Sequence, residues 1–394
     1  MLATRFGICV FLTSVIASVL AGCGGTDLAG IGDIGEQGDA RLDSVLGTIR
    51  RNWQVPALGV IAIAANAPLI RDNAVAGIRA EGSASRVGYD DLWHMGSLTK
   101  PMTATLAARL VESQTVAWDV TVGQVFPDFV GVIRPEYEDV RLDELMYHTA
   151  GLPTDVTLTP SWSSLRTDPA PLPEQRRRWA VELLSLEPAG ERGVHRYSDA
   201  GYIVAGAMME ELTGQSWEQL MQTRVFDPLG MTSAGFGPPG SIGAPPDQPR
   251  GHTRVSDGAP WLPLEPDANA DNPAALGPAG TVHVSLEDYG KYVREHLRGL
   301  RGSSDFLSAT SWGKLHTAAP GTGYALAWGV DQRTWAGGQA FAHSGSNAYW
   351  FAVAWIAPER DRAFVAVTNV GGVDGERATD QAVQALVLRA GFSF

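Results

Sequence analysis

Residues 96–100 have the sequence GSLTK, and this stretch places a serine and a lysine one helical turn apart. Ser97 follows an extended segment and opens a predicted helix, in whose first turn Pro101 is tolerated. A spacing of three residues puts Ser97 and Lys100 on one face of that helix. A serine hydroxyl is a poor nucleophile until a base takes its proton, and a lysine is such a base only when neutral. The stretch therefore predicts a serine nucleophile with a lysine partner.

Lysine usage in the rest of the chain supports this interpretation. Of the 30 basic residues, 27 are arginine, and the only lysines are Lys100, Lys291 and Lys314. Arginine keeps its proton in proteins, so it cannot act as this base. Lowering a lysine pKa from about 10.4 to near 7 requires roughly 4 to 5 kcal/mol of desolvation and nearby positive potential. A helix N-terminus, such as the one predicted at Ser97, supplies part of that potential.

Two elements further along the chain carry related chemistry. Tyr197 stands two residues before Asp199 at a predicted helix start, and a tyrosine hydroxyl beside a cationic lysine can relay a proton. Residues 343–346 (HSGS) lie just before an apolar, strand-like run. The glycine at position 345 would let a substrate lie against the edge of a strand.

In order and separation, these three elements resemble the serine β-lactamase and penicillin-binding protein superfamily, especially its branch of class C β-lactamases, D-amino-acid peptidases and esterases. Three further segments are similar to segments of that family: 142–153 (LDELMYHTAGLP), 228–231 (PLGM) and 277–289 (GPAGTVHVSLEDY). The resemblance runs from about residue 45 to 390. It implies an α+β fold of the β-lactamase/transpeptidase type: an antiparallel sheet flanked by helices, a mostly helical lobe, and an active site in the cleft between them.

The resemblance also implies catalytic roles. Ser97 would be the acylated nucleophile and Lys100 its partner base, while Tyr197 would activate the deacylating water or protonate the leaving group. Whether Lys100 or Tyr197 is the base during acylation stays open. The backbone N–H groups of Ser97 and Ser346 would form the oxyanion hole, where the loss of one donor typically costs about 3 kcal/mol. His148, within the segment 142–153, is expected to be structural.

Substrate contacts follow from the same resemblance, and they fall on Asp199, His343, Ser344, Gly345 and Asn369. Two of these positions depart from the β-lactamase pattern. Many relatives have Tyr-x-Asn where this chain has Asp199, and β-lactamases have Lys-Thr-Gly where this chain begins with His343. A histidine is largely neutral at pH 7. We therefore expect a less positive cleft that hydrolyses carboxylate-bearing β-lactams poorly.

The predicted function is a serine hydrolase that acts on an ester or amide bond through an acyl-enzyme, as an esterase or a D-amino-acid carboxypeptidase does. The alternatives are a genuine class C-like β-lactamase and a catalytically silent protein that binds cell-wall peptides. We expect a small-molecule or peptide substrate and neither a cofactor nor a metal, because the eight histidines occur without an HExxH pattern. The GxGxxG pattern at 30–35 follows no strand. A net charge of −13, from 30 basic and 43 acidic residues, argues against nucleic acid as a partner. The oligomeric state is left open.

The start of the chain resembles a bacterial lipoprotein leader. Arg5 gives a positive n-region, an apolar stretch follows, and residues 20–23 (LAGC) resemble a lipobox that implies cleavage and lipid attachment at Cys23. The alternative is an ordinary signal peptide with an incidental cysteine. We expect a signal peptide (1–22), a flexible tether (23–40) and a catalytic domain (41–394). A lipid anchor would hold the protein in the bacterial cell envelope, with its body in the periplasm or outside the cell.

Within the catalytic domain, hydrophobic periodicity predicts a sheet lobe from both chain ends and a helical lobe between them. The sheet lobe covers about 41–96 and 300–394, and the helical lobe about 97–299. The predicted strands are 57–65, 349–356 and 363–368. The predicted helices are 42–53, 101–113, 173–184, 199–212, 287–297 and 377–388. Long loops rich in glycine and proline are predicted at 235–249 and 260–278.

Overall fold

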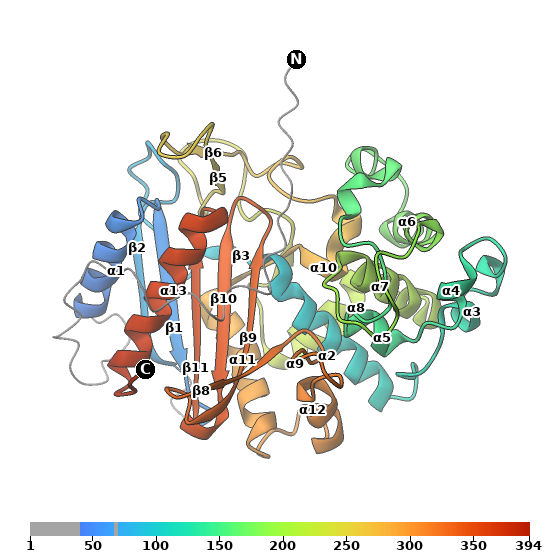
Figure 1. The fold of residues 1–394 in the computed structure, drawn as a ribbon. Helices are drawn as coiled ribbons and strands as arrows, with labels where there is room; N and C mark the ends of the chain where they lie inside the picture. Colours follow the sequence, from blue (N-terminus) through green and yellow to red (C-terminus); the bar gives the residue numbers. More distant parts are fainter. Residues whose placement is uncertain (1–39, 67–69) are drawn as a thin grey trace.

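The computed structural model describes residues 40–66 and 70–394. Within this part of the chain, both ends contribute to one antiparallel sheet of six strands, in the order β2-β1-β11-β10-β9-β8. Figure 1 shows the sheet beside the helical lobe. Its strands are β1 (Ala57–Ile63), β2 (Ile70–Gly77), β8 (Gly329–Arg333), β9 (Gly338–Ser346), β10 (Phe351–Ala357) and β11 (Arg362–Thr368). The predicted sheet from the two ends of the chain is confirmed.

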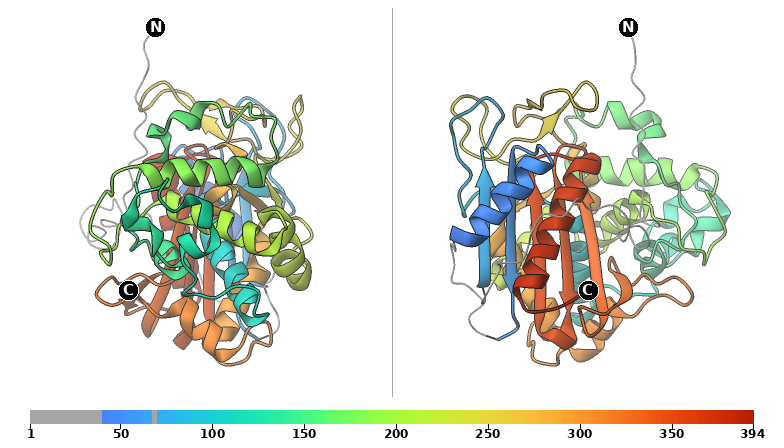
Figure 2. Two further views of the ribbon diagram at one scale, coloured as in Figure 1. Left: turned by 90° about the vertical axis from the view of Figure 1, so that its right-hand side faces the viewer. Right: turned by 60° about the vertical axis from the view of Figure 1, so that its left-hand side comes forward.

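Helices cover both faces of this sheet, and β1 shows how one strand meets both. All seven residues of β1 are buried, because alternate side chains point to opposite faces and each face is covered. Leu58 packs in one apolar cluster with α1 (Ala40–Asn52) and α13 (Gly372–Arg389). Ile61 lies on the opposite face against α11 (Leu286–Leu300). Figure 2 shows α1 and α13 side by side on their shared face.

The placement of α11 corrects the predicted lobe boundary. The sequence predicts a helical lobe that extends to about residue 299 and so includes this helix. In the structure α11 packs on the sheet, so closely that a Cβ on Gly290 would lie 3.2 Å from Ile61. Periodicity predicts a helix and its apolar face, but it does not say which element covers that face.

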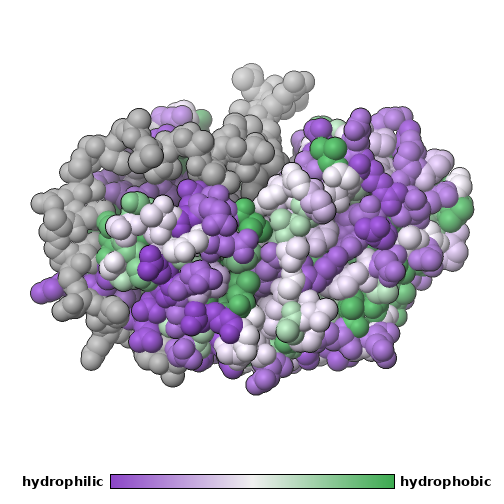
Figure 3. Space-filling model, turned by 60° about the horizontal axis from the view of Figure 1, so that its bottom comes forward, coloured by the Kyte–Doolittle hydropathy of each residue, from purple (hydrophilic) through white to green (hydrophobic). Residues whose placement is uncertain are grey.

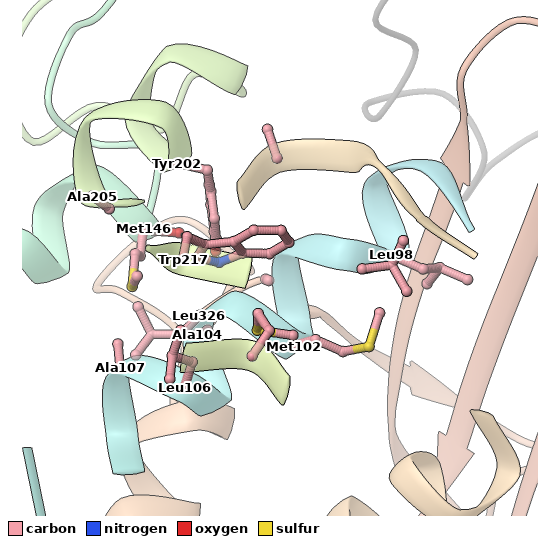
Figure 4. Packing of buried hydrophobic residues seen from close by; sticks show 14 of the residues in the cluster. Leu98, Met102, Ala104, Leu106, Ala107, Met146, Tyr202, Ala205, Trp217 and Leu326 are labelled. Atoms are coloured by element: carbon pink, nitrogen blue, oxygen red, sulfur yellow. The ribbon is translucent and has the colours of Figure 1, made fainter. Parts of the chain in front are cut away.

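The helical lobe is built around α2, the helix that begins just after Ser97. Figure 4 shows Leu98 and Met102 in an apolar cluster with Tyr202 and Trp217, and all four side chains are fully buried. This packing holds the start of α2 in place. The described helices other than α1, α11 and α13 are α2 (Thr99–Glu112), α3 (Val122–Val125), α4 (Pro135–Glu138), α5 (Leu142–Met146), α6 (Leu172–Ser185), α7 (Asp199–Thr213), α8 (Trp217–Met221), α9 (Asp227–Leu229), α10 (Gly277–Gly280) and α12 (Ala309–His316).

The described residues also form two small antiparallel sheets. One has the strand order β3-β7-β4 and leads directly into the turn that carries Ser97, and the other pairs β5 with β6. Their strands are β3 (Leu92–His94), β4 (Gly235–Phe236), β5 (His252–Thr253), β6 (Leu262–Pro263) and β7 (Val282–Ser285). The two predicted loops therefore contain short elements: β4 lies in 235–249, and β6 and α10 lie within or at the end of 260–278.

Strand β9 has one free edge near the helical lobe. It pairs with β10 from Phe341 to Ser346, whereas its pairing with β8 covers only Gly338 to Ala342. Residues 343–346 are thus paired on one side alone. Unpaired strand edges accept an additional extended segment through main-chain hydrogen bonds.

Several predictions about the start of the chain lie outside the described residues. These are the signal peptide 1–22, the lipid attachment at Cys23 and the GxGxxG segment 30–35. The first described helix begins at Ala40, at the predicted end of the tether. Among the described helices, none is long and apolar enough to cross a membrane. On the face in Figure 3, hydrophilic residues predominate, and hydrophobic residues form small separate groups.

Candidate active site

The turn before α2 brings Ser97 against strand β9. Gly96 begins a short 3-10 turn with φ +50°, a conformation that glycine adopts without strain. A Cβ on Gly96 would lie 2.3 Å from the backbone nitrogen of Ser346. On the other side of the contact, a Cβ on Gly345 would lie 2.6 Å from the backbone nitrogen of Ser97. The two glycines therefore allow the two candidate oxyanion donors to approach each other.

Lys100 is fully buried one turn beyond Ser97. Its Nζ lies 2.9 Å from Ser97 Oγ, 2.8 Å from the carbonyl oxygen of Ala279 and 2.6 Å from Asp199 Oδ1. Burial lowers the pKa of Lys100, and the negative charge of Asp199 opposes that shift. A neutral amine has two N–H donors and one lone pair, so it can donate to Ala279 and Asp199 and accept a proton from Ser97.

Tyr197 covers this pair from the helical lobe. The Lys100 Nζ lies 4.9 Å from the centre of the Tyr197 ring, and that ring packs on His148 with the centroids 4.4 Å apart. Burial, followed by the negative charge of Asp199, raises the pKa of Tyr197 well above its ordinary value, and the Ser97 hydroxyl opposes the rise. The phenol therefore keeps its proton at neutral pH.

His343 enters the cluster from β9. Its Nε2 is hydrogen-bonded to the Tyr324 hydroxyl at 3.0 Å. Burial, with a smaller contribution from the Lys100 charge, lowers the pKa of His343 to about 3. The ring is therefore neutral at physiological pH, as the sequence predicted. Tyr324 was missed by the sequence analysis, because only the fold brings its loop next to β9.

The family model described as Beta-lactamase matches residues 48–389. The chain belongs to the Beta-lactamase family. A penicillin-binding protein of Amycolatopsis lactamdurans is 26% identical over 318 residues, which cover 77% of this chain and 78% of that protein. An esterase of Burkholderia gladioli is 31% identical over 217 residues, about half of each chain.

Solved structures of the same fold agree with this assignment. A D-amino acid amidase from Ochrobactrum anthropi has a TM-score of 0.67 at 20% identity, covering 89% of this chain and 98% of that one. A class C β-lactamase from Rhodobacter sphaeroides has a TM-score of 0.65 at 18% identity, and the match covers 89% of this chain and 100% of that one. These likenesses confirm the predicted β-lactamase/transpeptidase-like fold. By its family, the chain is a hydrolase.

The contacts of Asn369 differ from those that the family resemblance implied. Its side chain is fully buried just after the end of β11. Its Oδ1 accepts a hydrogen bond from Ala57 N at 2.9 Å, and its Nδ2 faces the carbonyl oxygens of Ile78 and Arg79. The side chain therefore ties β11 to the chain segments around β1 and β2. The sequence analysis predicted that Asn369 contacts the substrate, whereas in the structure its side chain holds neighbouring strands together.

Ser344, which was predicted to contact the substrate, and His148, which was expected to be structural, have different places in this Beta-lactamase family member. Ser344 is half-buried, and strand alternation directs its side chain to the opposite face of β9 from that of His343. His148 accepts a hydrogen bond from the backbone N–H of Ser198 at 3.2 Å, which fixes the segment that carries Tyr197. Among the described residues, no group of three or more His, Cys, Asp or Glu side chains is arranged to hold a metal ion.

Proposed function

We propose that this protein is a serine hydrolase that cleaves an ester or amide bond through an acyl-enzyme on Ser97. The observation that carries the proposal is the 2.9 Å contact between Ser97 Oγ and the Nζ of a fully buried Lys100. A nucleophile within hydrogen-bond reach of a base with a lowered pKa is the arrangement that covalent catalysis requires.

In the proposed acylation step, Ser97 Oγ attacks the substrate carbonyl carbon while its proton passes to neutral Lys100. The carbonyl oxygen becomes an anion that accepts hydrogen bonds from the backbone N–H groups of Ser97 and Ser346. The C–O or C–N bond then breaks, and the leaving alcohol or amine takes the proton from Lys100 by way of the Tyr197 hydroxyl. Water attacks the acyl-enzyme along the same route, releasing the carboxylic acid and restoring Ser97.

The opposite pKa shifts of the two candidate bases support Lys100 as the acylation base. Burial favours the neutral form of each group: the amine of Lys100 and the phenol of Tyr197. A neutral amine accepts a proton, whereas a neutral phenol donates one. Two titratable groups whose environments move their pKa values apart are typical of an acid and base pair.

The charge balance of the site supports a neutral ester or amide as substrate. Within the described residues of the cluster, the positive charge that Lys100 gains on protonation is paired with the Asp199 carboxylate. His343 is neutral where β-lactamases have a lysine. Such a site lacks a free positive charge for a substrate carboxylate. The esterase and the D-amino acid amidase among the relatives are consistent with this substrate class.

A panel of substrates and one covalent probe test the proposal. The purified protein is assayed with short acyl esters, D-alanyl-D-alanine peptides and a chromogenic cephalosporin, and is treated with a serine-directed phosphonate. We expect turnover of an ester or amide, slower turnover of the cephalosporin, and a phosphonate adduct on the peptide that contains Ser97. A protein that neither turns over any of these substrates nor forms an adduct would refute the proposal.

The Asp199→Asn variant is expected to move the rising limb of the pH profile of kcat/KM to lower pH. The Asp199 charge favours the ammonium form of Lys100, so its removal lowers the Lys100 pKa further and leaves more neutral amine at a given pH. The control is Asp143→Asn, because Asp143 pairs with a different lysine, Lys314, at 2.8 Å. A limb that stays in place or moves to higher pH would mean that Asp199 does not set the Lys100 pKa.

We also propose that a lipid on Cys23 holds the protein at a bacterial envelope membrane. The support is the LAGC segment at 20–23 and the glycine-rich segment after it. The Cys23→Ala variant is expected to leave the membrane fraction when cells are fractionated. A variant that stays membrane-bound to the same degree as the wild type would contradict the lipid anchor.

A further inference from the structure

We infer that His94, Asp271 and Asn347 form a clasp that positions the two backbone N–H donors of the oxyanion hole. The inference rests on the proposed acyl-enzyme chemistry at Ser97. None of the three side chains contacts the reacting Ser97 Oγ, so they are positioning residues. Each is at least nine-tenths buried.

The first half of the clasp holds the turn that carries Ser97. His94 ends strand β3, and its Nδ1 lies 3.1 Å from the backbone N–H of Gly96. Because this N–H can only donate, Nδ1 must carry the lone pair, and the ring proton must lie on Nε2. That Nε2 lies 2.8 Å from Asp271 Oδ2, so it donates to the carboxylate. The imidazole is therefore hydrogen-bonded on one side to Asp271 and on the other to Gly96, the residue just before Ser97, and so fixes Gly96 relative to Asp271.

The second half holds the end of strand β9. The other carboxylate oxygen, Asp271 Oδ1, accepts a hydrogen bond from Asn347 Nδ2 at 2.9 Å. Asn347 directly follows Ser346, and its Oδ1 accepts from the backbone N–H groups of Tyr349 and Trp350. The Trp350 ring in turn stacks on His94, with the ring centres 5.4 Å apart. One buried carboxylate therefore links the chain just before Ser97 with the chain just after Ser346.

Such a link is useful because the two donors come from separate sheets. The turn at Gly96 follows the small sheet β3-β7-β4, whereas Ser346 ends β9 of the large sheet. An oxyanion hole acts only if both donors are held within a fraction of an ångström of the developing negative charge. Hydrogen bonds to a buried carboxylate are stronger than bonds between neutral groups, so Asp271 suits this task.

The test compares two substitutions of His94 with a control substitution of His283. The His94→Phe variant keeps the ring stack on Trp350 but removes the acceptor for Gly96 and the donor to Asp271. The His94→Asn variant keeps an acceptor near the position of Nδ1. The control is His283→Phe: His283 pairs with His94 in register on β7 but hydrogen-bonds the Gly237 carbonyl oxygen instead of Gly96.

We expect His94→Phe to lower kcat by about tenfold to a hundredfold with little change in KM, part of the loss typical for an oxyanion donor. A boronic acid forms a tetrahedral adduct on a catalytic serine and places an oxygen in the oxyanion hole. Its affinity should therefore fall by a factor similar to that of kcat. The His94→Asn variant should recover only part of both losses, because it restores the acceptor for Gly96 but not the donor to Asp271, and His283→Phe should stay within about twofold of the wild type.

The wild-type phosphonate adduct separates the two hypotheses. If the wild type forms no adduct on Ser97, the proposed function fails, and the clasp fails with it. If the wild type is labelled but a folded His94→Phe variant keeps kcat and boronate affinity within twofold, the clasp alone is wrong. If circular dichroism shows that His94→Phe does not fold, the same two measurements on Asn347→Ala decide: parallel losses support the clasp, and unchanged values overturn it.

Discussion

Ester or amide turnover by the Ser97→Ala variant is expected to fall by up to about a millionfold in kcat, the loss seen when other serine hydrolases lose their nucleophile. Without Oγ no acyl-enzyme forms, although Lys100, Tyr197 and the oxyanion donors remain. The covalent phosphonate adduct should disappear as well, and this is measured by mass spectrometry of the digested protein.

The matched control for Ser97→Ala is Ser113→Ala, because Ser113 caps the far end of the same helix, α2, and is exposed. This variant should keep both turnover and the adduct on Ser97. A Ser97→Ala variant that keeps turnover within tenfold of the wild type would show that another residue is the nucleophile.

The second large effect is expected for Lys100→Arg, which should lower kcat by about a hundredfold to ten-thousandfold, the usual contribution of a general base. An arginine keeps the positive charge but does not lose its proton at any working pH. It therefore preserves the attraction to Asp199 and removes the base. The Lys100→Met variant, which removes charge and base together, should be comparably inactive.

The pattern across these variants distinguishes a base from a simple cation. If only a positive charge mattered, Lys100→Arg would stay active and Lys100→Met would not, which would exclude Lys100 as the base. The control is Lys314→Arg: Lys314 also pairs with a carboxylate, that of Asp143, but it lies outside the cluster around Ser97. The rate of phosphonate labelling, measured on folded protein, reports the acylation step directly.

Local patterns explain which parts of the site were predictable. Ser97 and Lys100 are three residues apart on a helix, so their contact is set by helical geometry alone. The contact between Lys100 and Asp199 spans a longer stretch of chain, but the family resemblance placed both beside the nucleophile. The neutral state of His343 followed from the ordinary histidine pKa, and burial moves it further in the same direction.

Contacts set by tertiary packing were not predictable. A position at the end of a strand does not say where a side chain points, so Asn369 was assigned to the substrate although it binds Ala57. Strand β9 mixes glycine, serine and histidine with apolar residues, and this blurs the alternation that marks a strand. The bond between His94 and Asp271 joins residues 177 positions apart, and no local pattern indicates it.

The order of strands in the large sheet has a consequence for how the chain reaches its folded state during synthesis. Strand β1 is made early, yet its neighbour β11 is made some 300 residues later, and both lie inside the sheet. Until β11 emerges, one edge of the β1–β2 hairpin has no partner, and an apolar strand is left uncovered. Contacts between distant parts of a chain slow folding and expose such edges to aggregation. Folding of the sheet must therefore wait for the last tenth of the polypeptide, and a chain cut short before residue 362 would lack the strand that joins its two halves.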